Sequence, residues 1–154
     1  MNLSLNPKAF SGPLRFEWFV SEEGSTWQIA LNRLLSELGL DEIERVLVED
    51  LVGVTLGRIG KEKFRRHFEI RPISIGEDHS LVELRWLPQQ LIRGMHLRLY
   101  AHLDIPGGRL IGLCFKQKTI GKDLAETKLI QNQDIFRAID LAIQLKTDER
   151  DCEL

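Results

Sequence analysis

The chain has few of the residues and motifs that build metal, disulfide or nucleotide sites. It contains only two cysteines, Cys114 in an apolar run and Cys152 in the polar tail, which excludes a disulfide framework and a thiolate metal site. Its 4 histidines show no spacing typical of metal ligands. Neither glycine-rich phosphate-binding motif occurs. We therefore expect no metal and no cofactor.

Long hydrophobic runs are also missing. No stretch approaches the roughly 18 apolar residues of a membrane-spanning helix, and the first residues lack the pattern of a secretory signal. We therefore expect a cytoplasmic protein with no membrane contact. The 154 residues suit a single domain. We divide the chain into an N-terminal extension at 1–13, a core at 14–146 and a flexible acidic tail at 147–154.

The net charge of −2 conceals an uneven distribution along the chain. Residues 1–60 hold 5 basic and 9 acidic side chains, residues 61–128 hold 13 and 8, and residues 129–154 hold 3 and 6. A basic middle segment between acidic flanks can bind phosphates. An equally weighted alternative is a solvated surface with uneven charge.

The first third of the sequence predicts a strand followed by two helices. Residues 14–20 are aromatic and β-branched, which indicates a strand. Ser25 or Thr26 can cap a helix whose apolar residues recur at helical spacing until Gly39. Asp41 can cap a second helix, whose end is obscured by several glycines.

The second half predicts an antiparallel sheet. Pro72 indicates an edge strand or an extended linker. Alternation with a period of two then predicts strands over LVELRW, MHLRLYAHLD and RLIGLCFKQK, of which the last two are joined by a glycine-bearing hairpin. A polar linker over 119–133 precedes a final helix from Ile135. The fold class is therefore α+β, with three to four antiparallel strands packed against N-terminal helices and a C-terminal helix.

The same alternation assigns side chains to the two faces of this sheet. It predicts apolar faces made of Val82, Leu84 and Trp86, of Leu97, Leu99, Ala101 and Leu103, and of Ile111, Leu113 and Phe115. The other residues of these strands take the opposite, solvent-facing side: Glu83, Arg85, Arg98, Tyr100, His102, Asp104, Cys114, Lys116 and Lys118. Charged residues on a wet sheet face are also ordinary solvation, so this pattern alone leaves both interpretations open.

The residue types on the polar face suit phosphodiester chemistry. Guanidinium groups bind phosphate in a fork, ammonium groups supply point charge, and a phenol can exchange a proton or stack on a base. His102 is a candidate general acid or base, although a surface histidine without a role is the commoner case. Lys63, Arg65 and Arg66 are either a solvated rim or a phosphate contact.

From Leu81 to Leu145 the chain resembles the RelE/ParE superfamily of toxin-antitoxin toxins, especially its HigB-like members. The resemblance lies in LVELR, HLRLYAHLD, GGRLIGLCFKQKT and IFRAIDLAIQL, taken in that order. It implies a β-α-α-β-β-β-α fold, relative to which residues 86–95 are an insertion.

The resemblance implies a metal-independent, ribosome-dependent mRNA endonuclease that an antitoxin neutralises. Its partners would be that antitoxin, mRNA and the ribosome, and it could form homo- or hetero-oligomers. Residues that match the family's catalytic positions are Arg85, Arg98, Tyr100, Lys116 and Lys118. Candidate RNA-binding residues are Lys63, Arg65, Arg66, Arg109 and Lys122.

Two other functions remain open at this point. Fold does not fix activity, because ParE-like relatives inhibit gyrase. The same fold could also serve as a non-catalytic protein-binding or adaptor module that uses its sheet for a partner.

Overall fold

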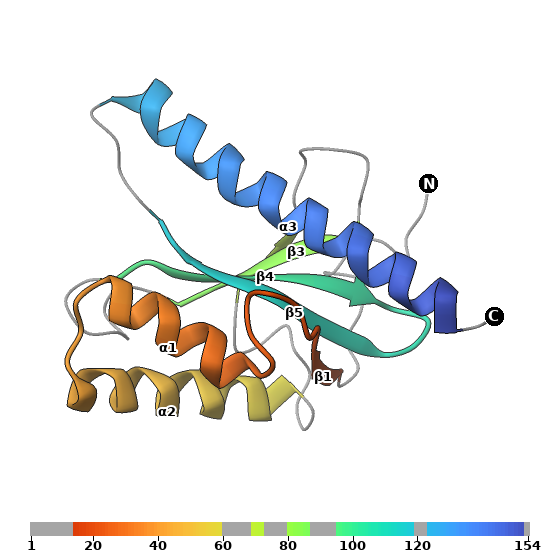
Figure 1. The fold of residues 1–154 in the computed structure, drawn as a ribbon, viewed down its shortest axis with the longest axis horizontal. Coiled ribbons are helices and arrows are strands. Elements are labelled where there is room, and N and C mark those ends of the chain that lie inside the picture. The colour runs from red at the N-terminus through yellow and green to blue at the C-terminus, as the bar shows by residue number, and fades with distance from the viewer. Residues whose placement is uncertain (1–13, 60–68, 73–79, 87–94, 119–122, 153–154) are drawn as a thin grey trace.

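The computed structural model describes residues 14–59, 69–72, 80–86, 95–118 and 123–152. The elements are, in chain order, β1 (Arg15–Trp18), α1 (Trp27–Glu37), α2 (Glu42–Ile59), β2 (Glu69–Pro72), β3 (Leu81–Arg85), β4 (Leu97–Asp104), β5 (Arg109–Gln117) and α3 (Leu124–Cys152). The protein is therefore α+β, as the sequence predicts (Figure 1). None of these helices is long and apolar enough to cross a membrane.

The strands form one five-stranded sheet in the order β1-β5-β4-β3-β2. The predicted hairpin is confirmed, because β4 and β5 pair antiparallel. Two features differ from the expected antiparallel sheet of three to four strands. The segment ending at Pro72 is an edge strand, which confirms one of the two interpretations of Pro72 and brings the number of strands to five. In addition, β1 joins the other edge in parallel to β5. The sheet is therefore mixed.

The two N-terminal helices begin where the sequence predicts. Thr26 caps α1 by accepting a hydrogen bond from the Ile29 N–H, and Gly39 follows the helix with a φ of 81°. Asp41 and Glu44 form a reciprocal capping box at the start of α2, with N–O distances of 2.8 and 3.1 Å. The helix then continues through its glycines to Ile59.

Helices cover both faces of the sheet, which corrects the expectation of one wet face. Figure 1 shows α1 and α2 on one side and α3 on the other. Trp86, Leu99 and Phe115 belong to the core on the α1 and α2 side. Tyr100 and Cys114 belong to a second core together with residues of α3. The side predicted to face solvent is therefore a second packed interface.

The helix α3 is longer than predicted at both ends. It begins at Leu124, within the expected linker 119–133, and continues to Cys152, so residues 147–152 of the expected flexible tail are helical. Its buried residues all lie in the C-terminal half: Ala138, Leu141, Ala142 and Leu145. Figure 1 shows the N-terminal half rising away from the sheet.

A β-bulge corrects the predicted faces of β5. Tyr100 of β4 pairs with Cys114, but the next residue, Ala101, pairs with Gly112. Leu113 is therefore the extra, unpaired residue of the bulge. The extra residue moves Ile111 and Leu113 to the α3 side, while Phe115 stays on the α1 and α2 side. Alternation alone cannot reveal such a change of phase.

Gly112 of β5 lies directly beneath aromatic rings of β1. A Cβ at this position would come within 2.8 Å of Trp18 Cε3 and 3.0 Å of Phe16 Cζ. The Trp18 ring is held in place, because it stacks on Phe115 at a centroid distance of 5.8 Å and its Nε1 donates to the Gly24 carbonyl at 3.0 Å. The parallel pairing of β1 and β5 therefore requires glycine here.

We expect Gly112→Ala to lower the free energy of unfolding by about 1–3 kcal/mol, because the added methyl group overpacks this contact. Chemical denaturation followed by tryptophan fluorescence measures the change. Gly57→Ala is the matched control, since a Cβ there meets nothing within 4 Å. Equal unfolding midpoints for Gly112→Ala and the wild type would contradict the close packing of β1 on β5.

Candidate functional site

Three of the predicted catalytic residues lie in one row across the sheet. Arg85 of β3 is the register partner of Arg98 in β4, and Arg98 is the partner of Lys116 in β5. Directly paired residues of neighbouring strands lie about 5 Å apart. The structure therefore brings these three cationic residues together. With Glu83, Tyr100 and Asp134 they form what we call the polar cluster.

Glu83 neutralises much of the positive charge in the polar cluster. Its carboxylate accepts from Arg85 Nε at 2.6 Å and lies 3.6 Å from Arg98 Nη1. The side chains of Glu83 and Arg98 are 7% and 9% exposed. A buried charge pair of this kind is costly to break, since removing one partner leaves the other uncompensated. Arg98 therefore has a structural partner that the sequence analysis did not assign to it.

Tyr100 is enclosed within the second core. It is 1% exposed and packs in the same cluster as Leu81, Ala138 and Leu141. Burial raises the pKa of Tyr100 to about 12, the negative charge of Glu83 adds to the rise, and a hydrogen bond from Arg98 opposes it. The phenol is therefore protonated at neutral pH and closed to solvent, which is unfavourable for a proton-transfer or base-stacking residue.

The helix α3 contributes a carboxyl group to the polar cluster. Asp134 is partly buried, and this burial raises its pKa, while the positive charges of Lys116 and Arg98 oppose the rise. Lys116 is partly exposed and forms no ion pair within the described segments. Lys118 lies just beyond β5, where its backbone N–H donates to the His96 carbonyl at 2.9 Å. Lys116 and Arg85 are thus the partly exposed cations of the row, whereas Arg98 is buried.

Arg109, a candidate RNA-binding residue, is instead a hub of ion pairs. Its guanidinium donates to Asp104 at 2.9 Å, Glu17 at 3.2 Å and Glu149 at 3.0 Å. These carboxylates come from β4, β1 and α3. The side chain therefore ties the edge strand and the C-terminal helix to the hairpin.

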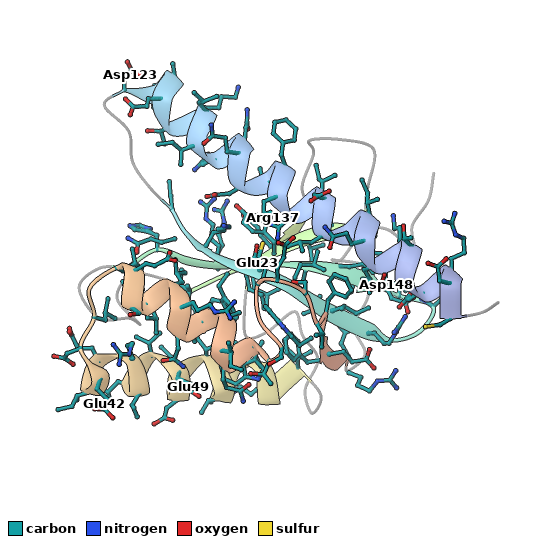
Figure 2. The ribbon with its side chains drawn as sticks, viewed as in Figure 1. Glu23, Glu42, Glu49, Asp123, Arg137 and Asp148 are labelled. Atoms are coloured by element: carbon teal, nitrogen blue, oxygen red, sulfur yellow. The ribbon has the colours of Figure 1, made fainter. Side chains whose placement is uncertain are left out.

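Arg137 ties the middle of α3 to the turn after β1. Its Nε donates to Glu23 at 2.8 Å, and further contacts reach Glu22 and Asp140 at 3.3 and 3.2 Å. Figure 2 shows Arg137 and Glu23 side by side, whereas Asp123 lies at the end of α3 that is farthest from the sheet. The C-terminal half of α3 is therefore anchored by charge as well as by apolar contact.

His102, the candidate acid or base, lies away from the cationic row. Its Nδ1 is 2.9 Å from Ser80 Oγ, a contact that alternation along the strands does not predict. Lys63, Arg65, Arg66 and Lys122 lie outside the described residues. The same holds for the insertion 86–95 apart from Trp86 and its last residue, Met95.

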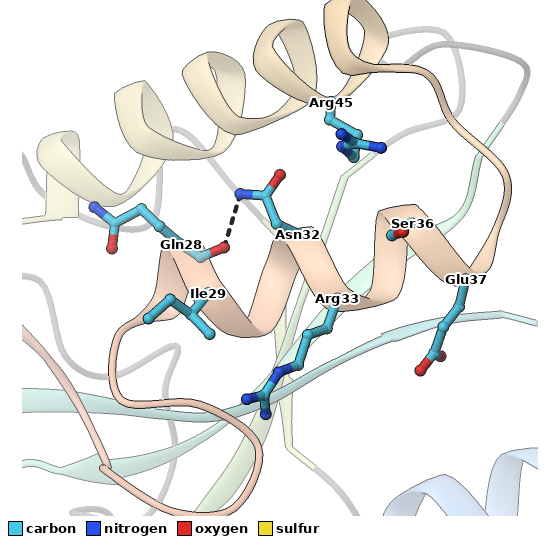
Figure 3. Close-up of a pocket in the computed structure, with 7 residues that line it drawn as sticks. All are labelled: Gln28, Ile29, Asn32, Arg33, Ser36, Glu37 and Arg45. Carbon is cyan, nitrogen blue, oxygen red and sulfur yellow. Dashed lines mark hydrogen bonds between the residues drawn. The ribbon is translucent and has the colours of Figure 1, made fainter.

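A separate hollow lies along α1, away from the polar cluster. Its lining residues are Gln28, Ile29, Asn32, Arg33, Ser36, Glu37 and Arg45 (Figure 3). Both arginines donate to backbone carbonyls: Arg33 to those of Glu22 and Glu23, and Arg45 to that of Leu40. These groups therefore hold turns in place.

Within the described part of the chain, no group of three or more histidine, cysteine or acidic residues could hold a metal ion. Cys114 is buried, and this burial raises the pKa of its thiol to about 12, so it is not a nucleophile at neutral pH.

No family model matches the chain, and comparisons with curated proteins and with solved structures find no match either.

Two members of the polar cluster were not predicted as site residues. Glu83 precedes Arg85 by two positions on a strand, so alternation already placed both on one face and could have identified the pair. Asp134 lies between the predicted linker, 119–133, and the predicted start of the final helix at Ile135. Helical spacing was too weak there to predict which side chain would meet the sheet.

The pKa of Tyr100 can be measured directly, because it is the single tyrosine of the chain. We expect the ultraviolet absorbance of the phenolate to titrate with a midpoint of about 12 in the folded protein and near 10.0 after unfolding in urea. The folded state then retains a proton that the unfolded state releases, so the free energy of unfolding falls as pH rises between these values.

Tyr100→Phe should remove the decrease in the free energy of unfolding at high pH, because phenylalanine keeps the buried ring and has no proton to release. A folded-state midpoint near 10.0, the value of an exposed tyrosine, would show that the phenol is not enclosed.

Proposed function

We propose that this chain is a protein-binding module that acts without catalysis. The observation that carries this proposal is an exposed apolar stripe on α2, which we call the α2 stripe. It consists of Ile43, Val46, Leu47 and Val54, which are 74%, 50%, 56% and 53% exposed. Ile43, Val46 and Leu47 are neighbours at helical spacing and Val54 follows two turns later, and a cluster of exposed apolar side chains marks a site of interaction.

The opposite face of α2 already satisfies the needs of the fold. Val48, Val52, Leu56 and Ile59 are buried in the core between the helices and the sheet. A surface helix normally places polar residues opposite such a face, and a helix that is apolar on both sides is normally covered on both. The α2 stripe therefore supports a partner that covers the outer side of this helix.

The state of the predicted catalytic residues also supports binding over catalysis. Arg98 is buried against Glu83, and Tyr100 is covered by α3. A catalytic group must come within hydrogen-bond reach of its substrate. In this arrangement those two side chains serve the interface between α3 and the sheet.

The α2 stripe can be tested with two leucines of nearly equal exposure. Leu47 is 56% exposed on α2 and Leu129 is 58% exposed on α3. We expect Leu47→Glu to lose a protein that copurifies with the tagged wild-type chain from its native cells, because a carboxylate would be buried in the contact.

Leu129→Glu adds the same charge elsewhere and should retain that protein. Circular dichroism should show both variants to be folded. Equal retention by both variants, or no stoichiometric partner for the wild type, would refute the assignment.

A RelE-like endoribonuclease is the second candidate, and the aligned row Arg85, Arg98 and Lys116 favours it. Three adjacent cations can stabilise the charge that develops on a phosphate during attack by a ribose hydroxyl. In this proposal the antitoxin, mRNA and the ribosome are the partners. Lys116 is partly exposed, and the rising N-terminal half of α3 would leave it open to RNA.

Purified protein added to a translating extract distinguishes the two candidates. As a binding module, the wild-type chain should leave the message intact and translation unimpaired. Cleaved message would establish the nuclease, provided that Lys116→Ala reduces cleavage by about 100-fold or more, in the range of lost electrostatic stabilisation. Lys146→Ala, which changes an exposed lysine of α3, is the matched control.

A further inference from the structure

The α2 stripe contains an acidic residue at its centre. Residues 43, 47, 50, 54 and 57 follow one another at alternating intervals of four and three, which places them on one side of a helix. Asp50 is exposed between the apolar positions Leu47 and Val54, and no ion pair to it occurs among the described residues. Any partner that covers the α2 stripe must therefore also cover this carboxylate.

The charge of Asp50 restricts the chemistry of the partner. Removing an unpaired carboxylate from water costs several kcal/mol, which would cancel much of the gain from the apolar contacts. A guanidinium or ammonium group opposite Asp50 removes this cost. Glu42 is a second exposed acidic residue, which Figure 2 labels at the start of α2, whereas the exposed Arg58 is a cation in the last turn of this helix.

A second copy of this chain is a poor occupant of the α2 stripe. Asp50 is midway between Ile43 and residue 57, so two copies paired in register would bring Asp50 against Asp50 in either direction. Like charges that face each other across helices destabilise the pair. A partner with the opposite charge does not meet this obstacle.

One turn beyond the α2 stripe, the backbone of α2 is open to close approach by the backbone of a partner. Gly57 is exposed within α2, and a Cβ there would meet nothing within 4 Å. Glycine inside a helix costs about 1 kcal/mol relative to alanine, and no packing within the described chain requires it at this position. Small residues let the backbone of a neighbouring element come close, as in closely packed helix pairs.

We infer that the α2 stripe binds an amphipathic helix of a partner protein, with an arginine or lysine of that helix paired to Asp50. This inference rests on the proposed protein-binding function. The partner helix places apolar residues at intervals of three and four against Ile43, Leu47 and Val54. Its arginine is placed opposite Asp50, and its backbone passes closest at Gly57.

Two synthetic helical peptides test the inference on the full-length chain. Both are about three heptads long with leucine at the a and d positions. One carries arginine at a central d position and lysines on the flanks, and the other carries glutamate at all of these positions. Fluorescence anisotropy at physiological salt measures the dissociation constant of each peptide for three proteins: the wild type, Asp50→Lys and Asp151→Lys. Asp151→Lys is the control, because it makes the same charge change at an exposed site of α3.

The wild type and Asp151→Lys should bind the basic peptide at least about tenfold more tightly than the acidic one, and Asp50→Lys should reverse the preference. The inference is overturned if neither peptide binds up to about 1 mM, if both bind equally, or if Asp50→Lys leaves the preference unchanged. A stripe-dependent dimer in sedimentation equilibrium also overturns it. In that case, loss of the copurified partner by Leu47→Glu would still support the binding function. Failure of the inference about Asp50 is therefore distinguishable from failure of the proposed function.

Discussion

The burial of both faces of β4 and β5 is the constraint on which the rest of the structure depends. Leu99 and Phe115 pack toward α1 and α2, while Tyr100 and Cys114 pack toward α3. On a central strand covered on both sides, a buried charged group needs a partner, because water does not reach it. The pairing of Glu83 with the neighbouring arginines follows from this requirement, and so does the protonated state of the tyrosine.

The same constraint moves the available binding surface from the sheet to the helices. The buried residues of α3 cover the second face at 138–145, while the N-terminal half of this helix rises away from the sheet (Figure 1). Most of the large apolar residues that remain exposed in the described part of the chain lie on α2 and α3, such as Ile43 and Phe136. Arg109 and Arg137 hold this arrangement, since each joins α3 to elements near the start of the chain.

Local signals in the sequence predicted the helices and strands well. The errors concern features that depend on contacts between segments far apart in the sequence. Thr26 and Asp41 cap their helices as expected, because a cap depends only on the next few residues. The parallel pairing of β1 with β5 and the covering of the sheet by α3 depend on contacts between distant segments. The row of Arg85, Arg98 and Lys116 was recoverable because alternation and a hairpin fix it, whereas the bulge at Leu113 and the position of Asp134 were not.

The two candidate functions differ in what they require of α3. For Arg98 and Tyr100 to reach a phosphodiester, the C-terminal half of this helix would have to leave the sheet. Exposing Leu141 and Leu145 alone would cost about 3–6 kcal/mol, and the ion pairs of Arg109 and Arg137 would also be lost. Domains of this size are stable by only about 5–15 kcal/mol in total, so such an opening would consume much of the stability. Binding through the outer side of α2 needs no rearrangement, because those side chains are already exposed in the folded state.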